Sequence, residues 1–222
     1  MTSKHSTWAC AAPLEQTLAP VGTDAGWLSP AERERCERFS GAQRRRQFVG
    51  GRWLARLLLA HVRGVADPAS LVLGLDPDGR SKAPPPWRLS ISHSGDWIGV
   101  AVADASLVGM DLQVDAPGRD WQALAAFAGL QPCLDSAYFY RHWTLAEAWL
   151  KAHPDITSLT SLRGLRWQPD AAGPAWHGQV GALHWTVVGA SAPQWVGSLL
   201  PQSLQPAPGD GWAPLDGTVS GA

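Results

Sequence analysis

Val108-Gly109-Met110-Asp111-Leu112-Gln113 alternates apolar with polar residues, which is the period of a half-buried β-strand. Side chains two residues apart on a strand point to the same face, so Asp111 and Gln113 would present two oxygen-bearing groups side by side. An aspartate near the end of a strand is also a common turn residue. The stretch therefore predicts a strand with a polar face, whose chemistry depends on what lies opposite.

Residues 143–152 (WTLAEAWLKA) predict a helix, because they are rich in Ala and Leu and contain no Gly or Pro. Glu147 and Lys151 are one helical turn apart and would share one stripe of this helix. A strand that offers Asp and Gln, facing a helix that offers Glu and Lys, could hold a hard divalent cation with a phosphate beside it. The alternative is an ordinary exposed Glu–Lys pair, which contributes little to stability.

Residues 87–103 predict a β-hairpin, with its turn at Ser94-Gly95-Asp96. Ser92 and His93 lie where the first strand gives way to this turn. Small hydroxyls, exposed amides and an imidazole suit the oxygens of a phosphate group. The alternative is a structural histidine that is hydrogen-bonded within the fold.

Basic residues gather in the N-terminal half of the chain. Between Pro30 and Gly64 there are nine arginines and three glutamates, a local balance of +6 in a chain whose net charge is −1. Arginine suits bidentate contact with phosphate, so an anionic ligand is favoured. The alternative is an exposed helix face in a chain that prefers arginine to lysine. Nucleic acid is a poor fit, because the isoelectric point is near neutral and no basic aromatic platform is evident.

Composition limits the remaining classes of protein. A chain of 222 residues with 45% hydrophobic residues can bury a substantial core, in one domain or two small ones. It has no apolar run of about eighteen residues, so no membrane span is expected. The three cysteines form no CxxC pair and the first residues resemble no secretory signal, which together predict a cytoplasmic protein. The seven histidines show no zinc-binding spacing.

SISHSGDW (90–97), VGMDLQ (108–113) and FYRHWTLAEAWLKA (139–152) follow one another as the motifs of the Sfp-type 4′-phosphopantetheinyl transferase superfamily do. Residues 28–39 and 44–58 also resemble the N-terminal helices of that family. The resemblance covers about residues 25–200. It implies an enzyme that transfers the 4′-phosphopantetheine arm of coenzyme A to a serine of an apo carrier protein, acyl or peptidyl, and releases adenosine 3′,5′-bisphosphate.

The resemblance also implies roles for the acidic residues. Asp111 and Glu147 would bind Mg²⁺, with Gln113 as a third oxygen ligand. Glu147 would take the proton from the incoming serine, directly or through water. Lys151 would neutralise charge on the transferred phosphate, so Glu147, Lys151 and Asp111 are the implied catalytic residues.

The coenzyme A contacts implied by the resemblance come from the N-terminal half. Arg46 or Arg52 would replace an arginine that relatives carry where this chain has Gln47, and either Arg80 or Lys82 could reach the nucleotide. The full set is Arg35, Arg46, Arg52, Arg80, Lys82, Ser92 and His93. A further hypothesis from charge is that Arg44, Arg45 and Arg46 together help to dock an acidic carrier protein.

Two departures from the family pattern weaken the inferred activity. Gln113 stands where the pattern has a second acid, and Ala146 stands where it usually has a lysine. A second hypothesis is therefore a catalytically weakened relative that binds coenzyme A or a carrier without efficient turnover. A third is an unrelated α+β binding module with an incidental Asp/Glu cluster.

The expected fold is α+β, with two similar α+β subdomains related by a pseudo-twofold and a ligand cleft at their junction. A faint internal repeat agrees with the family on this point, since each half reads as helix, loop and hairpin. We expect a loose N-terminal segment (1–25), an N-terminal subdomain (26–105), a C-terminal subdomain with the metal site (106–200) and a disordered tail (201–222). A monomer is expected, and the carrier could serve fatty acid, polyketide or nonribosomal peptide synthesis.

Overall fold

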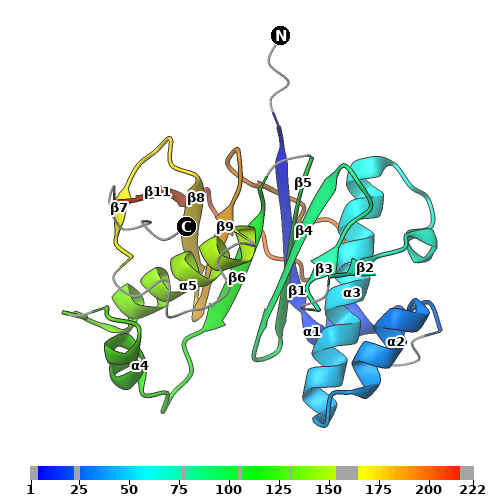
Figure 1. The fold of residues 1–222 in the computed structure, drawn as a ribbon, viewed down its shortest axis with the longest axis horizontal. Helices are drawn as coiled ribbons and strands as arrows, with labels where there is room; N and C mark the ends of the chain where they lie inside the picture. The colour runs from blue at the N-terminus through cyan, green and yellow to red at the C-terminus, as the bar shows by residue number, and fades with distance from the viewer. Residues whose placement is uncertain are drawn as a thin grey trace.

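The computed structural model describes residues 5–22, 26–76, 79–104, 107–130, 132–153 and 165–215. Two β-sheets lie face to face, and each has helices on its outer side (Figure 1). The layers run from helix α3 through the first sheet and the second sheet to helix α5. This arrangement confirms the α+β class.

The first sheet has the strand order β10-β1-β5-β4. Its strands are β1 (Thr7–Pro13), β4 (Trp87–Ser94), β5 (Trp97–Asp104) and β10 (Gln194–Trp195). Strands β4 and β5 form the predicted hairpin, in which Ser94 pairs with Trp97 across a turn that holds Gly95 at φ 55°. Helices α1 (Leu14–Leu18), α2 (Pro30–Glu37) and α3 (Ala42–Arg63) lie on its outer side, followed by a 3₁₀ turn at Pro68–Ser70 and the small pair β2 (Gly74–Leu75) and β3 (Ser81–Lys82).

The expectation of a loose N-terminal segment is wrong for strand β1 and helix α1. Strand β1 is central in the first sheet, paired with β5 on one side and β10 on the other. Its residues alternate between two cores: Cys10 and Ala12 pack in the core with α3, whereas Ala9 and Ala11 face the second sheet. The weak hydrophobic signal of these small residues hid the strand. Residues 1–4 and 23–25 lie outside the described residues.

The second sheet has the strand order β6-β9-β8-β11-β7. Its strands are β6 (Gly109–Val114), β7 (Trp167–Pro169), β8 (Ala175–Val180), β9 (Leu183–Val188) and β11 (Asp210–Pro214). Helix α5 (Ser136–Ala152) packs on its outer face and the short helix α4 (Trp121–Phe127) packs against α5 (Figure 1). The predicted strand at 108–113 and the predicted helix at 143–152 are both confirmed.

The disordered tail expected from residue 201 onward is wrong for β11. This strand pairs with both β7 and β8, and Trp212 is buried beneath α5. A Pro- and Gly-rich composition hid a strand that is stabilised by one large aromatic side chain and long-range pairing. Residues 216–222 lie outside the described residues, as does the subdomain boundary expected at 105–106. Strand β10 belongs to the first sheet, so the C-terminal half returns to the N-terminal core.

Helix α5 approaches strand β6 so closely that only glycine fits at position 109. A Cβ atom added to Gly109 would lie 1.9 Å from the carbonyl oxygen of Ala148 and 2.9 Å from the backbone nitrogen of Ala152. Both obstacles are backbone atoms, which a rotamer change cannot move. The close approach brings the side chains of α5 to the polar face of β6. No helix among the described residues is long and apolar enough to cross a membrane.

Gly109→Ala is expected to lower the free energy of unfolding by about 3 kcal/mol or more, because the two backbones must separate. The matched control is Gly26→Ala, since a Cβ at Gly26 meets nothing within 4 Å. That variant should stay within about 0.5 kcal/mol of the wild type. Urea unfolding measures both changes, and equal midpoints for the two variants would contradict the close packing of α5 on β6.

Candidate functional site

The edge of β6 is joined to β4 by a row of serine hydroxyls. The serines alternate along β4, so all three point to one side of the strand. Each hydroxyl accepts a hydrogen bond from a backbone N–H of β6: Ser90 from Met110 at 2.9 Å, Ser92 from Leu112 at 3.1 Å and Ser94 from Val114 at 2.9 Å. These bonds satisfy backbone donors that the second sheet leaves unpaired at this edge. Asp111 and Gln113 are thereby held at the junction of the two sheets.

Asp111 is the centre of a buried polar cluster that draws on three elements. Its Oδ1 accepts hydrogen bonds from Ser92 Oγ of β4 at 2.8 Å and from Lys151 Nζ of α5 at 2.6 Å. Lys151 Nζ also lies 3.2 Å from Ser92 Oγ. The other carboxylate oxygen, Oδ2, is buried and has no hydrogen-bond partner among the described groups. A buried carboxylate oxygen without a partner is costly, which marks this oxygen as a candidate ligand for a cation.

Glu147 lies one turn before Lys151 on α5, and both side chains line the same cavity. Burial raises the pKa of the Glu147 carboxyl, the negative charge of Asp111 raises it further, and the Lys151 ammonium partly opposes both effects. The salt bridge of Lys151 is with Asp111 rather than along the helix surface. The interpretation as an exposed Glu–Lys pair is therefore disfavoured, and the predicted meeting of strand and helix occurs.

The donor chemistry at this junction fits Mg²⁺. Two carboxylates are present, one with an unpartnered oxygen, and Mg²⁺ takes one or two protein carboxylates and fills its other positions with water and phosphate. The amide oxygen of Gln113 accepts hydrogen bonds from Arg119 Nη1 at 3.0 Å and from Ser94 Oγ at 3.4 Å. Gln113 as a metal ligand stays a prediction. Within the described ranges, no group of three or more His, Cys, Asp or Glu side chains is placed to hold a metal.

A cavity of about 340 Å³ opens between α2, α3, the β2–β3 turn, β4 and α5. Arg35 and Arg44 both line it, with their guanidinium carbons 5.2 and 5.1 Å from the ring centre of Phe39. Burial lowers the pKa of Arg44, and the nearby positive charge of Arg35 lowers it further. Arg80 and Lys151 add positive charge to the lining. Crowded cations of this kind favour a ligand that carries several negative charges.

His93 also lines the cavity, and its contact with a phosphate stays a prediction. Burial lowers the pKa of its imidazole to about 4, and the positive charges of Arg44 and Lys151 contribute to the shift. The ligand-free imidazole is therefore neutral at neutral pH. It can donate one hydrogen bond to a phosphate oxygen without adding charge to the site.

The other predicted coenzyme A contacts do not all line the large cavity. Arg80 lines the large cavity, whereas Lys82 lines a neighbouring cavity of about 230 Å³ that Arg80 shares. The Arg46 guanidinium is paired with Glu15, and the Ser92 hydroxyl is engaged by Asp111 and β6, so both residues as coenzyme A contacts stay predictions.

Arg44, Arg45 and Arg46 have different partners, and their part in docking a carrier protein stays a prediction. Arg44 lines the cavity, Arg45 donates to the carbonyls of Phe39 and Ser40, and Arg46 pairs with Glu15. Arg44 lines the cavity although it was not among the predicted coenzyme A contacts. Three adjacent arginines left the choice open, because the phase of the helix decides which one faces the cavity.

No family model matches the chain. It is similar to curated proteins named 4′-phosphopantetheinyl transferase. The relative from Bacillus subtilis is 31% identical over 56% of this chain and 59% of its own length. HetI from Nostoc is 28% identical over 64% of this chain and 66% of its own length. AcpT from Salmonella typhimurium is 32% identical over 45% of this chain and 56% of its own length.

The similarity confirms the family resemblance seen in the motifs. The match spans less than two thirds of the length of each of these relatives.

Glu147→Gln is expected to raise the Tm at pH 7 while removing any catalytic role. Folding raises the pKa of Glu147 above its ordinary value of 4.5, so above that pH the ionised carboxylate lowers the stability of the folded state. The amide removes this cost. The gain should vanish in calorimetry at pH 4, where the carboxyl is protonated in both states. A Tm at pH 7 equal to or below that of the wild type would contradict the assigned environment.

Proposed function

We propose that this protein is a Mg²⁺-dependent 4′-phosphopantetheinyl transferase that acts on a serine of an apo acyl or peptidyl carrier protein. The observation that carries the proposal is the cluster of Asp111, Lys151 and Glu147 beside a cavity lined by arginines. The similarity to proteins of that name supports the reaction class. Coenzyme A is the co-substrate that this reaction requires.

The cavity suits the phosphates of coenzyme A. Arg35, Arg44 and Arg80 come from the N-terminal half, and Lys151 comes from α5 on the opposite side. Phosphoryl transfer is catalysed mainly by positioning the reactants and by stabilising charge, which fixed cations around a pyrophosphate provide. Neutral His93 would add a hydrogen bond to a phosphate oxygen.

The transfer step moves one phosphoryl centre. The carrier serine oxygen forms a bond to the phosphorus next to the pantetheine arm, and the bond from that phosphorus to the bridging oxygen breaks. Adenosine 3′,5′-bisphosphate leaves with the electron pair. Glu147 accepts the serine proton, directly or through water, and Lys151 neutralises charge on the transferred phosphate. Mg²⁺ held by Asp111 and Glu147 would supply Lewis-acid polarisation of the pyrophosphate.

A catalytically weakened relative is the second candidate function. Gln113 brings no negative charge to the metal site, and its amide oxygen is already engaged by Arg119. Ala146 removes one cation of the family pattern. Such a protein would bind coenzyme A or a carrier without efficient turnover.

The test is to incubate the protein with coenzyme A, Mg²⁺ and a panel of apo carrier proteins and to weigh the carriers by mass spectrometry. We expect a gain of one phosphopantetheine group. EDTA should abolish it, and Glu147→Ala should slow it by at least about 100-fold, because a general base is lost.

The matched control for this assay is Glu34→Ala, which removes an exposed glutamate on α2 and should leave the rate unchanged. Coenzyme A binding without any mass gain would favour the weakened relative. Neither binding nor mass gain would contradict the proposal as a whole.

A further inference from the structure

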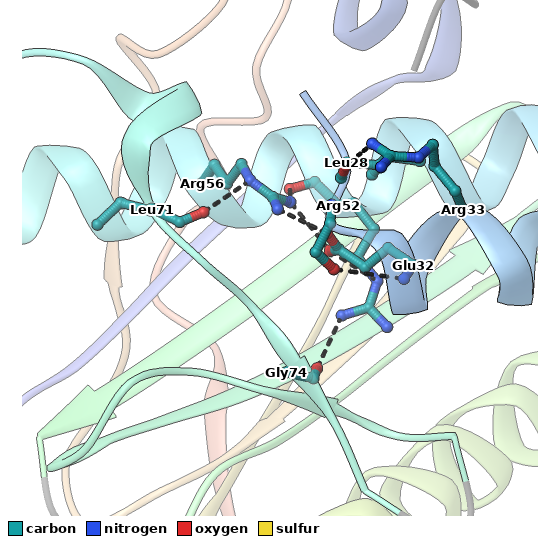
Figure 2. Close-up of polar contacts among 8 residues, drawn as sticks. Leu28, Glu32, Arg33, Arg52, Arg56, Leu71 and Gly74 are labelled. Carbon is teal, nitrogen blue, oxygen red and sulfur yellow. Dashed lines mark hydrogen bonds and ion pairs between the residues drawn. The ribbon is translucent and has the colours of Figure 1, made fainter. Parts of the chain in front are cut away.

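Glu32 of α2 has no exposed surface, although acidic side chains are seldom fully buried unless they are paired. Figure 2 shows it pointing at Arg52 and Arg56 of α3. Arg56 binds it with both terminal nitrogens, Nη2 to Oε2 at 2.7 Å and Nη1 to Oε1 at 3.1 Å. Arg52 Nε lies 3.7 Å from Oε1, and the backbone N–H of Ser29 donates to Oε2 at 2.8 Å.

The cluster places two buried guanidinium groups against one carboxylate. Arg52 and Arg56 are 2% and 1% exposed. Burial lowers the pKa of Arg52 to about 10, against the opposing effect of Glu32. A buried ion cluster adds little net stability, because well-packed apolar residues of similar volume often contribute as much or more. Fixing one arrangement of neighbouring segments is a use that such a cluster can have.

The two arginines extend the cluster to a third segment. Arg56 Nε donates to the carbonyl oxygen of Leu71 at 3.0 Å, and Arg52 Nη1 donates to that of Gly74 at 3.4 Å (Figure 2). Gly74 begins β2, which pairs with β3. Glu32 therefore links α2 to α3 directly, and its two partners link both helices to Leu71 and to Gly74, where β2 begins.

These three segments are also three walls of the large cavity. Helix α2 contributes Arg35, one turn after Glu32, while α3 contributes Arg44 and the β2–β3 turn contributes Gly79 and Arg80. Arg35 lies against the turn itself: a Cβ on Gly79 would be 3.1 Å from Arg35 Nη2. The position of the Arg35 guanidinium thus depends on how α2 and the turn are held.

We propose that Glu32 is a positioning residue for the anion-binding side of this cavity. Glu32 is fully buried and does not line the cavity, and it acts by holding Arg35 and Arg80 toward that cavity. The identity of the anion as coenzyme A rests on the proposed function. The placement of the three cavity walls by Glu32 is independent of the proposed function.

A double-mutant cycle in coenzyme A affinity tests this inference. Calorimetry without divalent metal compares the wild type, Glu32→Gln, Arg35→Met and the double variant. Glu32→Gln should weaken coenzyme A binding roughly tenfold, because a misplaced Arg35 would lose one charge-assisted contact with the anion. It should raise KM for coenzyme A while kcat is unchanged, because the lost interaction is equally present in the ground and transition states. Arg35→Met should add little in the Glu32→Gln background, because the two residues act as one unit.

Glu34→Gln is the matched control, since Glu34 is an exposed glutamate on the same helix and pairs with Arg38. It should bind coenzyme A as the wild type does. Where Glu32→Gln fails to fold, Glu32→Asp keeps the charge, shortens its reach by one methylene and enters the same cycle. Wild-type affinity in the folded Glu32 variant, or losses that simply multiply in the double variant, would overturn the inference.

Adenosine 3′,5′-bisphosphate as a second probe separates the two claims. If the wild type binds this nucleotide but modifies no carrier, the proposed function fails. The Glu32 cycle, run on nucleotide affinity, then still decides the inference. If the wild type binds neither coenzyme A nor the nucleotide, both claims are wrong.

Discussion

Three serine hydroxyls of β4 accept hydrogen bonds from the backbone N–H groups at the free edge of β6, and the polar site at the junction of the two sheets depends on them. The contact uses side chains on one strand and main chain on the other, so the sheets meet without merging. The central serine, Ser92, also donates to Asp111. One row of bonds therefore joins the two halves and orients the carboxylate. The close packing of α5 at Gly109 then brings Lys151 and Glu147 to the same point.

Several charged and polar groups of the site lack a balancing partner in the protein itself. On the acidic side, Asp111 keeps one buried oxygen unpartnered and Glu147 has a raised pKa. On the basic side, Arg35 and Arg44 crowd one aromatic ring, and His93 is kept neutral. Such an arrangement lowers the stability of the ligand-free protein. A cation bound by the acidic side and a polyanion bound by the basic side would each offset the cost on that side. Glu32 has the opposite character, since its buried charge is fully engaged.

Local periodicity predicted the β4–β5 hairpin, strand β6 and helix α5, and the spacing of Glu147 and Lys151 predicted that they share one stripe of that helix. Strand β1 escaped prediction because Ala-Cys-Ala-Ala carries little hydrophobic signal, although these residues are buried in the two cores. Strand β11 escaped because its partners are distant in sequence. The choice among Arg44, Arg45 and Arg46 depended on helix phase and on tertiary partners. The role of Ser92 depended on a strand edge that only the assembled sheets create.

A crystal structure of the protein with coenzyme A and Mn²⁺ would locate the metal site, because the anomalous signal identifies Mn²⁺ bound in place of Mg²⁺. We expect a manganese peak at bonding distance from Asp111 Oδ2 and Glu147, with the phosphates of coenzyme A between Lys151 and the arginines of α2 and α3. Coenzyme A bound outside this cavity, or manganese away from Asp111, would contradict the assignment of the site to the junction of the two sheets.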